Sequence, residues 1–431
     1  MRLAFTEKFF EITFHYSSSV TDDEAIYFAF VVPWSYEEDQ VTRSLLPLML
    51  IGFVNYKGLV NQLEQDYQND TNIYFNRENL IWSIEKRRLD LLTISSKEGM
   101  LSERESPIAN LFPGGNKESR PFKFDPAKKK YVLISARVHP GEVAASHVMR
   151  RLLTFLLDRS DPRAKAARDQ YVFCIIPMLN PDGVYRGHYR ADSLGQNLNR
   201  YYINPSLVNQ PTIYGAKQLI MNLNNSGRLF LYLDLHAHAG KKGCFVYGNT
   251  LDYSRQIQSR IFPKLLSLNS TIFDYEGSSF SDANLKVKEK GQIQNKDGAG
   301  RVAIYKATNL VNCYTLEVNY NAGKIRNILT QPVNLHGPLE EGKNCIAVIE
   351  GFIVIEKGYT AEDLKWEEAD IERYDCSDPY KIQELEQLGE AIVVSLADMA
   401  GANPLSRLAS SPYKKLRVMV MLKGSFLNCF R

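Results

Sequence analysis

The chain has 431 residues, enough for up to three domains or for one large α/β domain with an appendage. It carries 52 Lys and Arg against 49 Asp and Glu, a net charge of +3, and 44% of its residues are hydrophobic. These values are ordinary for a globular protein and exclude wholesale disorder, collagen and a coiled coil for the chain as a whole. The near-neutral charge also excludes a chain built mainly to bind nucleic acid, so we expect no nucleic-acid partner.

Cysteine usage and hydropathy predict a cytoplasmic protein without a membrane partner. The six cysteines are scattered and form no CxxC pair, which favours free thiols in a reducing compartment. The N-terminal segment interrupts its apolar residues with Glu7, Lys8 and Glu11, so we expect no signal peptide. The longest apolar run, 45–54, contains a proline and a glycine and is too short to span a bilayer.

The N-terminal part of the chain has the pattern of β-structure. Residues 1–34 are rich in alternating aromatic residues and predict two strands, 10–14 and 27–33, joined by a polar turn. Two strands do not bury a core of their own, so they are expected to belong to something larger. Residues 59–67 have helical spacing, and 79–95 predict a hairpin with a charged turn.

From residue 131 onward, short buried strands alternate with helices. This pattern predicts an α/β fold with a mixed sheet that is parallel in its centre and flanked by helices. The predicted strands are 131–136, 171–177, 229–235 and 313–318, and the predicted helices are 144–158 and 385–402.

The strongest local signal is the segment RVHPGE, which follows a predicted buried strand and precedes a predicted helix. In open α/β sheets, ligands bind beyond the carboxyl ends of the strands. His139 and Glu142 flank a Pro-Gly turn, so an imidazole and a carboxylate can converge there as two of the three ligands of a His₂Glu zinc site. Taken alone, HxxE also occurs on ordinary surfaces, and that alternative stays open.

A third ligand is expected from the end of another strand. The predicted strand 229–235 delivers His236 just past its edge, and His238 points the same way two residues later. The spacing leaves the choice between these two histidines open.

Glu317 is the candidate general base. It is the carboxylate of the apolar strand predicted at 313–318, where a buried acid is unfavourable unless it is paired or functional. A hydrolase with a metal-bound water needs such a base. The alternative is a glutamate at the exposed end of the strand.

Two arginines between these motifs have a possible use in catalysis or substrate binding. Arg190 lies in HYR, and Arg200 lies in NLNR. A guanidinium group binds a carboxylate through two hydrogen bonds or stabilises an oxyanion. The alternative for each arginine is a solvated surface charge.

Five motifs occur in order along the chain: RVHPGE, NPDGVYRGHYRADSLGQNLNR, LDLHAHAGKKGCFVYGN, GRVAIYKATN and CYTLEVNYN. Together they resemble the zinc metallocarboxypeptidases, and specifically the cytosolic carboxypeptidases that shorten glutamate chains on tubulin. The residues of these motifs are most similar to those of the type-5 branch of that subfamily. The resemblance covers about residues 24–335 with interruptions, and five ordered motifs are far more specific than any one of them.

The resemblance implies the zinc carboxypeptidase fold, one Zn²⁺ per chain and a role for each matching residue. The zinc ligands of the family match His139, Glu142 and His236. This match favours His236 over its neighbour His238.

The catalytic and substrate-binding roles are implied in the same way. Glu317 matches the general base, and Arg190 matches the arginine that polarises the scissile carbonyl. Asn199 and Arg200 match the pair that grips the terminal carboxylate of the substrate. Asn197 stands where many secreted relatives have an aspartate behind a zinc-bound histidine, so we expect this neutral partner to soften zinc binding.

The domain organisation departs from that of the family. The family has a β-sandwich before the catalytic domain, and residues 1–34 resemble only a remnant of it, a partial N-terminal β domain. We expect the catalytic domain at 35–410, with insertions near 41–58 and 345–371, and a basic tail at 411–431.

An acidic leaving residue needs a basic group in its pocket, and Arg301 is the candidate. The stretch around it is mostly basic and would steer an acidic tail toward the site, although a solvated loop is the alternative. Its charged residues are Lys286, Lys288, Lys290, Lys296, Arg301 and Lys306, against Glu289 and Asp297.

The resemblance therefore implies a zinc carboxypeptidase that removes glutamate, including branch-point glutamate, from polyglutamylated protein side chains. The expected partners are polyglutamylated tubulin or other glutamate-tailed proteins, in the cytoplasm, with microtubules and the nucleus as further locations. Two alternatives remain: a zinc acylase acting on small N-acyl amino acids, and a non-catalytic tubulin-binding homologue.

Overall fold

The computed structural model of the chain divides into two units, Met1–Phe30 and Val31–Arg431. The structure describes residues 2–5, 10–13, 29, 31–36, 58–115, 117–281, 296–323, 325–334, 348–349, 352–353 and 380–411. In the first unit, β1 (Arg2–Phe5) pairs antiparallel with β2 (Phe10–Thr13). All the candidate site residues belong to the second unit.

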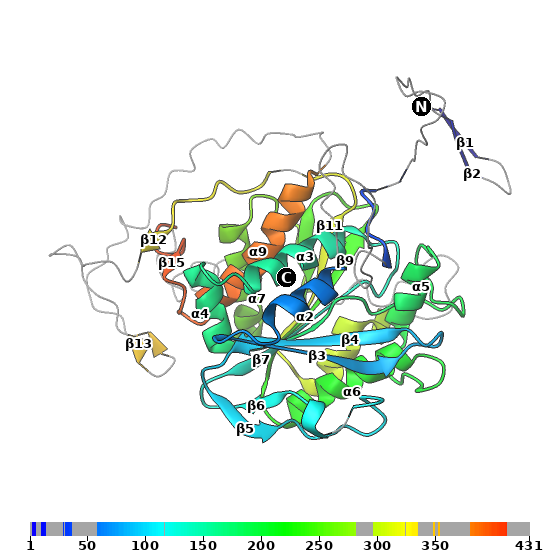
Figure 1. The fold of residues 1–431 in the computed structure, drawn as a ribbon. Coiled ribbons are helices and arrows are strands. Elements are labelled where there is room, and N and C mark those ends of the chain that lie inside the picture. The colour runs from blue at the N-terminus through cyan, green and yellow to red at the C-terminus, as the bar shows by residue number, and fades with distance from the viewer. Residues whose placement is uncertain are drawn as a thin grey trace, which may run out of the picture. The chain divides into compact units, whose positions relative to one another are not determined.

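A seven-stranded sheet forms the centre of the second unit (Figure 1). Its strands, in spatial order, are β10 (Cys244–Tyr247), β11 (Asn312–Asn319), β9 (Leu229–His238), β7 (Lys130–Ala136), β8 (Tyr171–Ile176), β4 (Arg88–Ser96) and β3 (Ile73–Trp82). The strands β11, β9, β7 and β8 run parallel, and antiparallel strands extend the sheet on both sides. The predicted sheet with a parallel centre is therefore confirmed.

The central strands form because their side chains are apolar on both faces. Every residue of β8 is buried, and so is every residue of β7 after the first. Such continuous apolar runs are typical of a parallel sheet that is covered on both sides. The predicted hairpin is also present as β3 and β4, and its turn contains Lys86 in the left-handed region, with φ of 62°.

Helices cover both faces of this sheet (Figure 1). One face packs against α2 (Leu59–Tyr67), α3 (Ala144–Leu156), α4 (Pro162–Gln170), α7 (Tyr253–Asn269) and α9 (Ile382–Met399). The other face packs against α6 (Pro211–Asn225) and α8 (Gly300–Thr308). The arrangement explains why the sequence alternates between buried strands and amphipathic helices. None of the helices in the described part of the chain combines the length and the hydropathy that a membrane span needs.

Shorter elements complete the described chain. They are the helix α5 (Pro181–Tyr185), the 3₁₀ turns η1 (Lys117–Ser119), η2 (Leu198–Arg200) and η3 (Lys296–Gly298), and the strand pairs β5 (Met100–Arg104) with β6 (Phe122–Phe124), β12 (Val333–Asn334) with β15 (Leu405–Ser406), and β13 (Val348–Ile349) with β14 (Phe352–Ile353).

Two predicted boundaries are wrong for identifiable reasons. The strand β9 extends to His238, three residues beyond its predicted end, because β11 keeps pairing with it after β7 has ended at Ala136. The helix α9 ends at Met399 because Gly401 takes up a left-handed conformation, with φ of 68°, shortly after it.

Of the two strands predicted in the N-terminal part of the chain, one is present. The strand predicted at 10–14 is present as β2, but it pairs with β1, and residues 31–33 of the second predicted strand are irregular. Trp34 is buried in the core of the second unit. The proposed limits of the domains stay predictions. Most of the two predicted insertions, the tail after residue 411 and Lys286, Lys288 and Lys290 lie outside the described residues.

Candidate metal centre and active site

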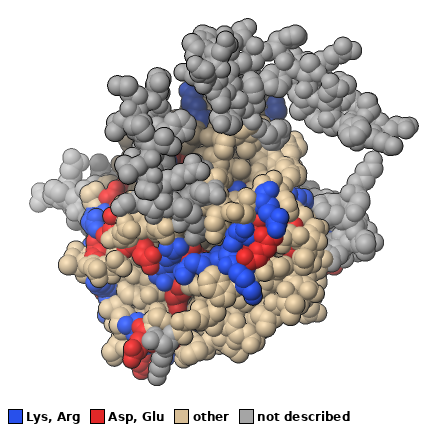
Figure 2. All heavy atoms as spheres, turned by 45° about the vertical axis from the view of Figure 1, so that its right-hand side comes forward, with Lys and Arg blue, Asp and Glu red and all other residues tan. Residues whose placement is uncertain are grey.

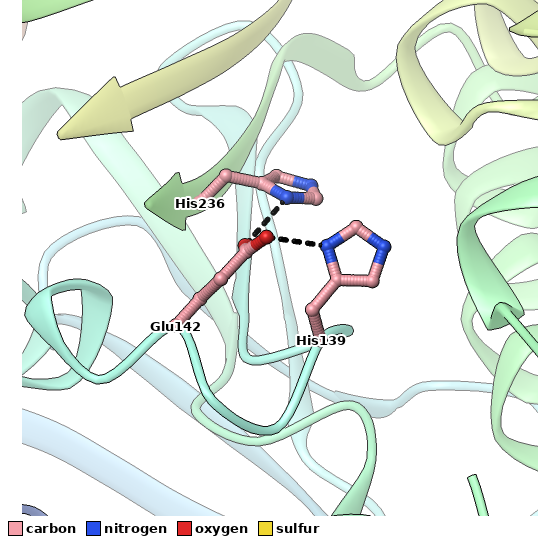
Figure 3. A group of neighbouring side chains, drawn as sticks. All are labelled: His139, Glu142 and His236. Carbon is pink, nitrogen blue, oxygen red and sulfur yellow. Dashed lines mark hydrogen bonds and ion pairs between the residues drawn. The ribbon is translucent and has the colours of Figure 1, made fainter. Parts of the chain in front are cut away.

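His139, Glu142 and His236 converge at the carboxyl ends of β7 and β9 (Figure 3). The Nδ1 atom of His139 lies 2.6 Å from Glu142 Oε1, and the Nδ1 atom of His236 lies 2.8 Å from Glu142 Oε2. All three side chains are buried, and their ligand atoms lie within 4.8 Å of one another. Two imidazole nitrogens and one carboxylate around a common point are the donor set of a His₂Glu zinc site, so these residues fit one zinc ion.

The loop after β7 holds two of these side chains in place. Arg137, with φ of 58°, turns the chain out of the strand, and its buried guanidinium donates hydrogen bonds to Pro140 O and Ser146 Oγ. Gly141 donates its N–H to Tyr189 O over 2.8 Å, and a Cβ atom at Gly141 would lie 2.6 Å from that oxygen. The turn therefore needs glycine because another backbone segment passes directly against it.

Burial and neighbouring charges act differently on the three ligands. They favour the metal-binding forms of Glu142 and His139, but they favour the protonated form of His236, whose Nδ1 proton a metal ion would displace. Burial alone raises the pKa of Glu142, but His139 and His236 outweigh this effect and hold that pKa well below its usual range. Burial also lowers the pKa of His139, which keeps its ring neutral at pH 7. For His236, burial is outweighed by Asp234 and Glu142, which hold the pKa of the imidazole well above its usual value.

A different residue holds the far nitrogen of each histidine. The Nε2 atom of His139 lies 2.9 Å from Asn197 Oδ1, and the Nε2 atom of His236 lies 2.9 Å from Asp234 Oδ2. Asp234 is not among the residues predicted from the sequence. The available signal was its position two residues before His236 in a strand, which places both side chains on one face of the sheet.

Glu317 lies beside the metal ligands. Its strand β11 pairs with β9 so that Glu317 is directly opposite His236. Burial, with a smaller contribution from the charge of Glu142, raises the pKa of Glu317 to about 8, while His236 lowers it. A divalent cation in the neighbouring site stabilises the charged form of such a carboxyl group. The alternative of an exposed glutamate does not hold, because Glu317 lines the cavity.

Arg190, Asn199 and Arg200 are the three candidate substrate-binding residues. They line the same cavity as the metal ligands. Arg190 Nη1 lies 3.6 Å from Glu142 Oε1. Arg200 is buried and donates to Asn199 O over 2.8 Å, while Asn199 Oδ1 accepts the N–H of Gly300 over 2.8 Å. The first bond lies within the 3₁₀ turn η2, and the second fixes this turn against the start of α8.

One cavity of about 370 Å³ brings the site together. Its lining includes every predicted site residue: His139, Glu142, Arg190, Asn199, Arg200, His236, Arg301 and Glu317. Arg301, in the first turn of α8, is buried and donates to Asn249 Oδ1 over 2.6 Å. Lys296 also lines the cavity, whereas Lys306 pairs with Asp297 on the exposed side of α8.

Two tyrosines also border this cavity and were not identified from the sequence. The hydroxyl groups of Tyr189 and Tyr320 lie 3.5 Å apart. Tyr320 directly follows β11, three residues after Glu317, so its position in the motif CYTLEVNYN was the available signal.

The fold and this site define a zinc carboxypeptidase. Residues 60–322 match the zinc carboxypeptidase family, and the chain belongs to it. Zinc is the metal of that family, and the His-Glu-His set provides a site for one ion.

The similar proteins agree with this assignment. The chain is 32% identical to human cytosolic carboxypeptidase-like protein 5 over an alignment of 484 positions, gaps included, that covers 90% of this chain and 49% of that protein. It is 35% identical to mouse cytosolic carboxypeptidase 6 over 303 residues, covering 69% of this chain and 46% of that protein. The chain thus spans about half the length of these relatives. A metallo-carboxypeptidase from Burkholderia cenocepacia has the same fold, with a TM-score of 0.51 and 18% identity over 80% of this chain and 67% of that one.

Proposed function

We propose that the chain is a protein deglutamylase, which hydrolyses the C-terminal amide bond of a glutamate on polyglutamylated side chains. The observation that carries this proposal is the single cavity in which a His-Glu-His set, a glutamate and several arginines meet. The likeness to cytosolic carboxypeptidase-like protein 5 supports the same reaction.

The chemistry assigns a task to each residue. When bound by His139, Glu142 and His236, zinc polarises the scissile carbonyl group and lowers the pKa of water. Glu317 takes a proton from the attacking water, whose oxygen bonds to the carbonyl carbon. Arg190 donates hydrogen bonds to the carbonyl oxygen as negative charge develops there.

The leaving step uses the same base. Glu317 passes the proton to the amide nitrogen, the C–N bond breaks, and the departing glutamate leaves with a free amine. Asn199 and Arg200 bind the terminal carboxylate of the substrate. They make the enzyme an exopeptidase, because an internal peptide bond has no carboxylate to pair with a buried guanidinium group.

Selectivity for glutamate is assigned to Arg301. On the face shown in Figure 2, Lys and Arg side chains lie next to Asp and Glu side chains in a mixed band. The positive charge that suits an acidic side chain is instead inside the cavity, where Arg301 and Lys296 lie. A charged hydrogen bond is stronger in such a buried place than on the surface.

The natural substrates are proposed to be tubulin and other glutamate-tailed proteins in the cytoplasm, with microtubules and the nucleus as further locations. A branch-point glutamate is linked through a side-chain carboxyl group, so its acyl side is bent and bulky. The resemblance to the type-5 branch supports branch-point removal, and 370 Å³ is a volume within the range of small-molecule sites.

Glutamate release from a synthetic peptide with a polyglutamate tail tests the proposal, with Glu317→Gln as the matched variant. The variant keeps the shape of the side chain but loses the base, so it should bind zinc and the peptide while turnover falls by at least about 100-fold. Binding without release by the unmodified chain would indicate a non-catalytic homologue. Activity on an N-acyl amino acid but not on the peptide would indicate an acylase. Either result would contradict the proposal.

A further inference from the structure

The two histidines of the metal site have supporting partners of different charge. Asn197, a neutral amide, faces Nε2 of His139, and Asp234, a carboxylate, faces Nε2 of His236. In both rings the Nδ1 atom points toward Glu142. A donor proton fixed on Nε2 leaves the Nδ1 lone pair available to a metal, so both partners select the same ring tautomer.

Asp234 is held in a position from which it serves His236. It lies in β9 with no exposed surface, and its Oδ1 atom accepts a hydrogen bond from Ser135 Oγ over 2.7 Å. Ser135 is its neighbour in the register of β7 and β9. In the described part of the chain, the ion-pair partner of this carboxylate is His236 alone. Because a buried carboxylate costs free energy unless it is paired, its place in the sheet is explained by that pairing.

Asn197 supports His139 more weakly. Its Oδ1 atom is shared between the His139 ring and the N–H of Asn199, at 2.9 and 3.1 Å. Its Nδ2 atom is buried and has no hydrogen-bond partner among the described residues. An oxygen in place of this nitrogen would therefore lose no hydrogen bond.

We propose that Asp234 is a positioning residue of the zinc site: it holds His236 with Nε2 protonated and strengthens Nδ1 as a donor, and so supplies the negative charge that Asn197 does not give to His139. The inference rests on the zinc site and not on the identity of the substrate. Its readout is zinc affinity, so it can fail while the proposed deglutamylase activity stands, and the reverse.

The first test measures the zinc dissociation constant by competition with a chelator, for the unmodified chain and for Asp234→Asn. The variant keeps the shape and an acceptor oxygen but removes the charge. Loss of such a partner lowers metal affinity by about 10- to 100-fold, which is the expected result. An unchanged dissociation constant would overturn the proposal.

Asp398→Asn is the matched control. Asp398 is also a buried acid. It lies in the last turn of α9 and accepts hydrogen bonds from Asn269 and Asn403, neither of which is a metal ligand. Its replacement should leave the zinc dissociation constant unchanged. Equal weakening in both variants would show a general loss of stability and would also overturn the proposal.

A charge swap separates charge from shape. In the double variant Asp234→Asn with Asn197→Asp, the carboxylate moves from one histidine to the other, and zinc affinity should recover by about 10-fold relative to Asp234→Asn. No recovery would contradict the proposed role of charge. Asn197→Asp alone covers the case in which Asp234→Asn does not fold. It should bind zinc more tightly than the unmodified chain, and weaker binding would overturn the proposal.

Discussion

Both carboxylate oxygens of Glu142 are engaged, one by each histidine, so the three ligands act as a unit. Their contacts differ behind the rings, because the partner of His139 is neutral and that of His236 is charged. Removal of either histidine takes away one of three protein donors. Removal of His139 leaves the neutral amide of Asn197 without its partner, whereas removal of His236 leaves the carboxylate of Asp234 without its partner.

We therefore predict that His139→Ala and His236→Ala each lower the bound zinc below one ion per chain, as measured by elemental analysis. The metal-free proteins should also differ in thermal stability. His236→Ala leaves Asp234 buried without its ionic partner, which costs about 3 kcal/mol or more, so it should unfold at a lower temperature than His139→Ala. One zinc per chain in both variants would contradict the assignment.

In the proposed reaction, Arg301 binds the side chain of the departing residue and Arg200 binds its terminal carboxylate. We predict that Arg301→Ala lowers kcat/KM on a glutamate-ended peptide by about 10- to 200-fold, because the side-chain carboxylate of the departing residue loses its partner. A peptide that ends in an uncharged residue should be nearly unaffected.

Arg200→Ala is the contrasting variant, since it affects the terminal carboxylate that every substrate carries, and it should slow both peptides alike. Arg301→Lys should lie between the unmodified chain and the alanine variant, because it keeps the charge but loses the fork that also contacts Asn249. If Arg301→Ala slowed both peptides equally, selectivity would have to come from another residue, such as Lys296.

The candidate residues that belong to short motifs could be selected from the sequence, although an alternative stayed open for each of them. His139 and Glu142 are only three positions apart, and Glu317 is unusual within an apolar strand. Asp234 was missed because its partner is visible only in the folded sheet, where β7 and β9 place Ser135 beside it. The choice between His236 and His238 needed the resemblance, because two residues on one face of a strand have equivalent spacing.

At the scale of the elements, the crossing of α3 and α9 closes one face of the sheet. Gly389 lies at this crossing, where a Cβ atom would lie 2.1 Å from Val148 O and 2.8 Å from Leu152 N. Glycine is required here because two helix backbones approach each other closely. The atoms that a Cβ atom would meet belong to the backbone of α3, so no side-chain rotation could make room for it.

We predict that Gly389→Ala lowers the free energy of unfolding by about 1–3 kcal/mol, because the helices must separate. Gly215→Ala in α6 is the matched control, since its Cβ atom would meet only side-chain atoms, mainly those of Ile81. In both variants, alanine has a helix propensity up to about 1 kcal/mol more favourable than glycine. The difference between their free energies of unfolding therefore reports the effect of the close backbone contact at Gly389. Urea unfolding of both variants measures it, and equal stabilities would show that α9 does not pack on α3 this closely.

The central elements were predictable, whereas the helices α4, α6, α7 and α8 and the strand β10 were not predicted, and the ends of the elements were less certain than their existence. The hairpin, the central strands and the closing helix follow from periodicity and from buried apolar runs. The extension of β9 through His236 was not predictable, because it depends on pairing with β11, a strand about 80 positions later in the chain.

At the scale of the whole molecule, the two ends of the central strands carry different polar groups. The carboxyl ends of β7 and β9 hold the metal ligands, while the amino end of β7 is anchored by the buried ammonium group of Lys129. Its Nζ atom donates hydrogen bonds to both hydroxyl groups of Ser95 and Ser96 and to the carbonyl oxygens of Ser96 and Arg168. These contacts tie β4, β7 and α4 together, and all four acceptors are neutral oxygens.

The burial of this ammonium group should make the stability of the second unit depend on pH. Burial lowers the pKa of Lys129 from 10.5 to about 8. Below pH 8 the group is charged in both the folded and the unfolded chain, and above pH 10.5 it is neutral in both. Between these values the unfolded chain binds more protons, so the contribution of Lys129 to the free energy of unfolding rises with pH.

We predict that the difference in the free energy of unfolding between the unmodified chain and Lys129→Met changes by about 2–3 kcal/mol over this range, as measured by urea unfolding at a series of pH values. The exposed neighbour Lys130→Met is the control, because it removes an equal charge without disturbing the buried cluster. A constant difference between the unmodified chain and Lys129→Met from pH 8 to 10.5 would show that the ammonium group is not buried as the structure describes.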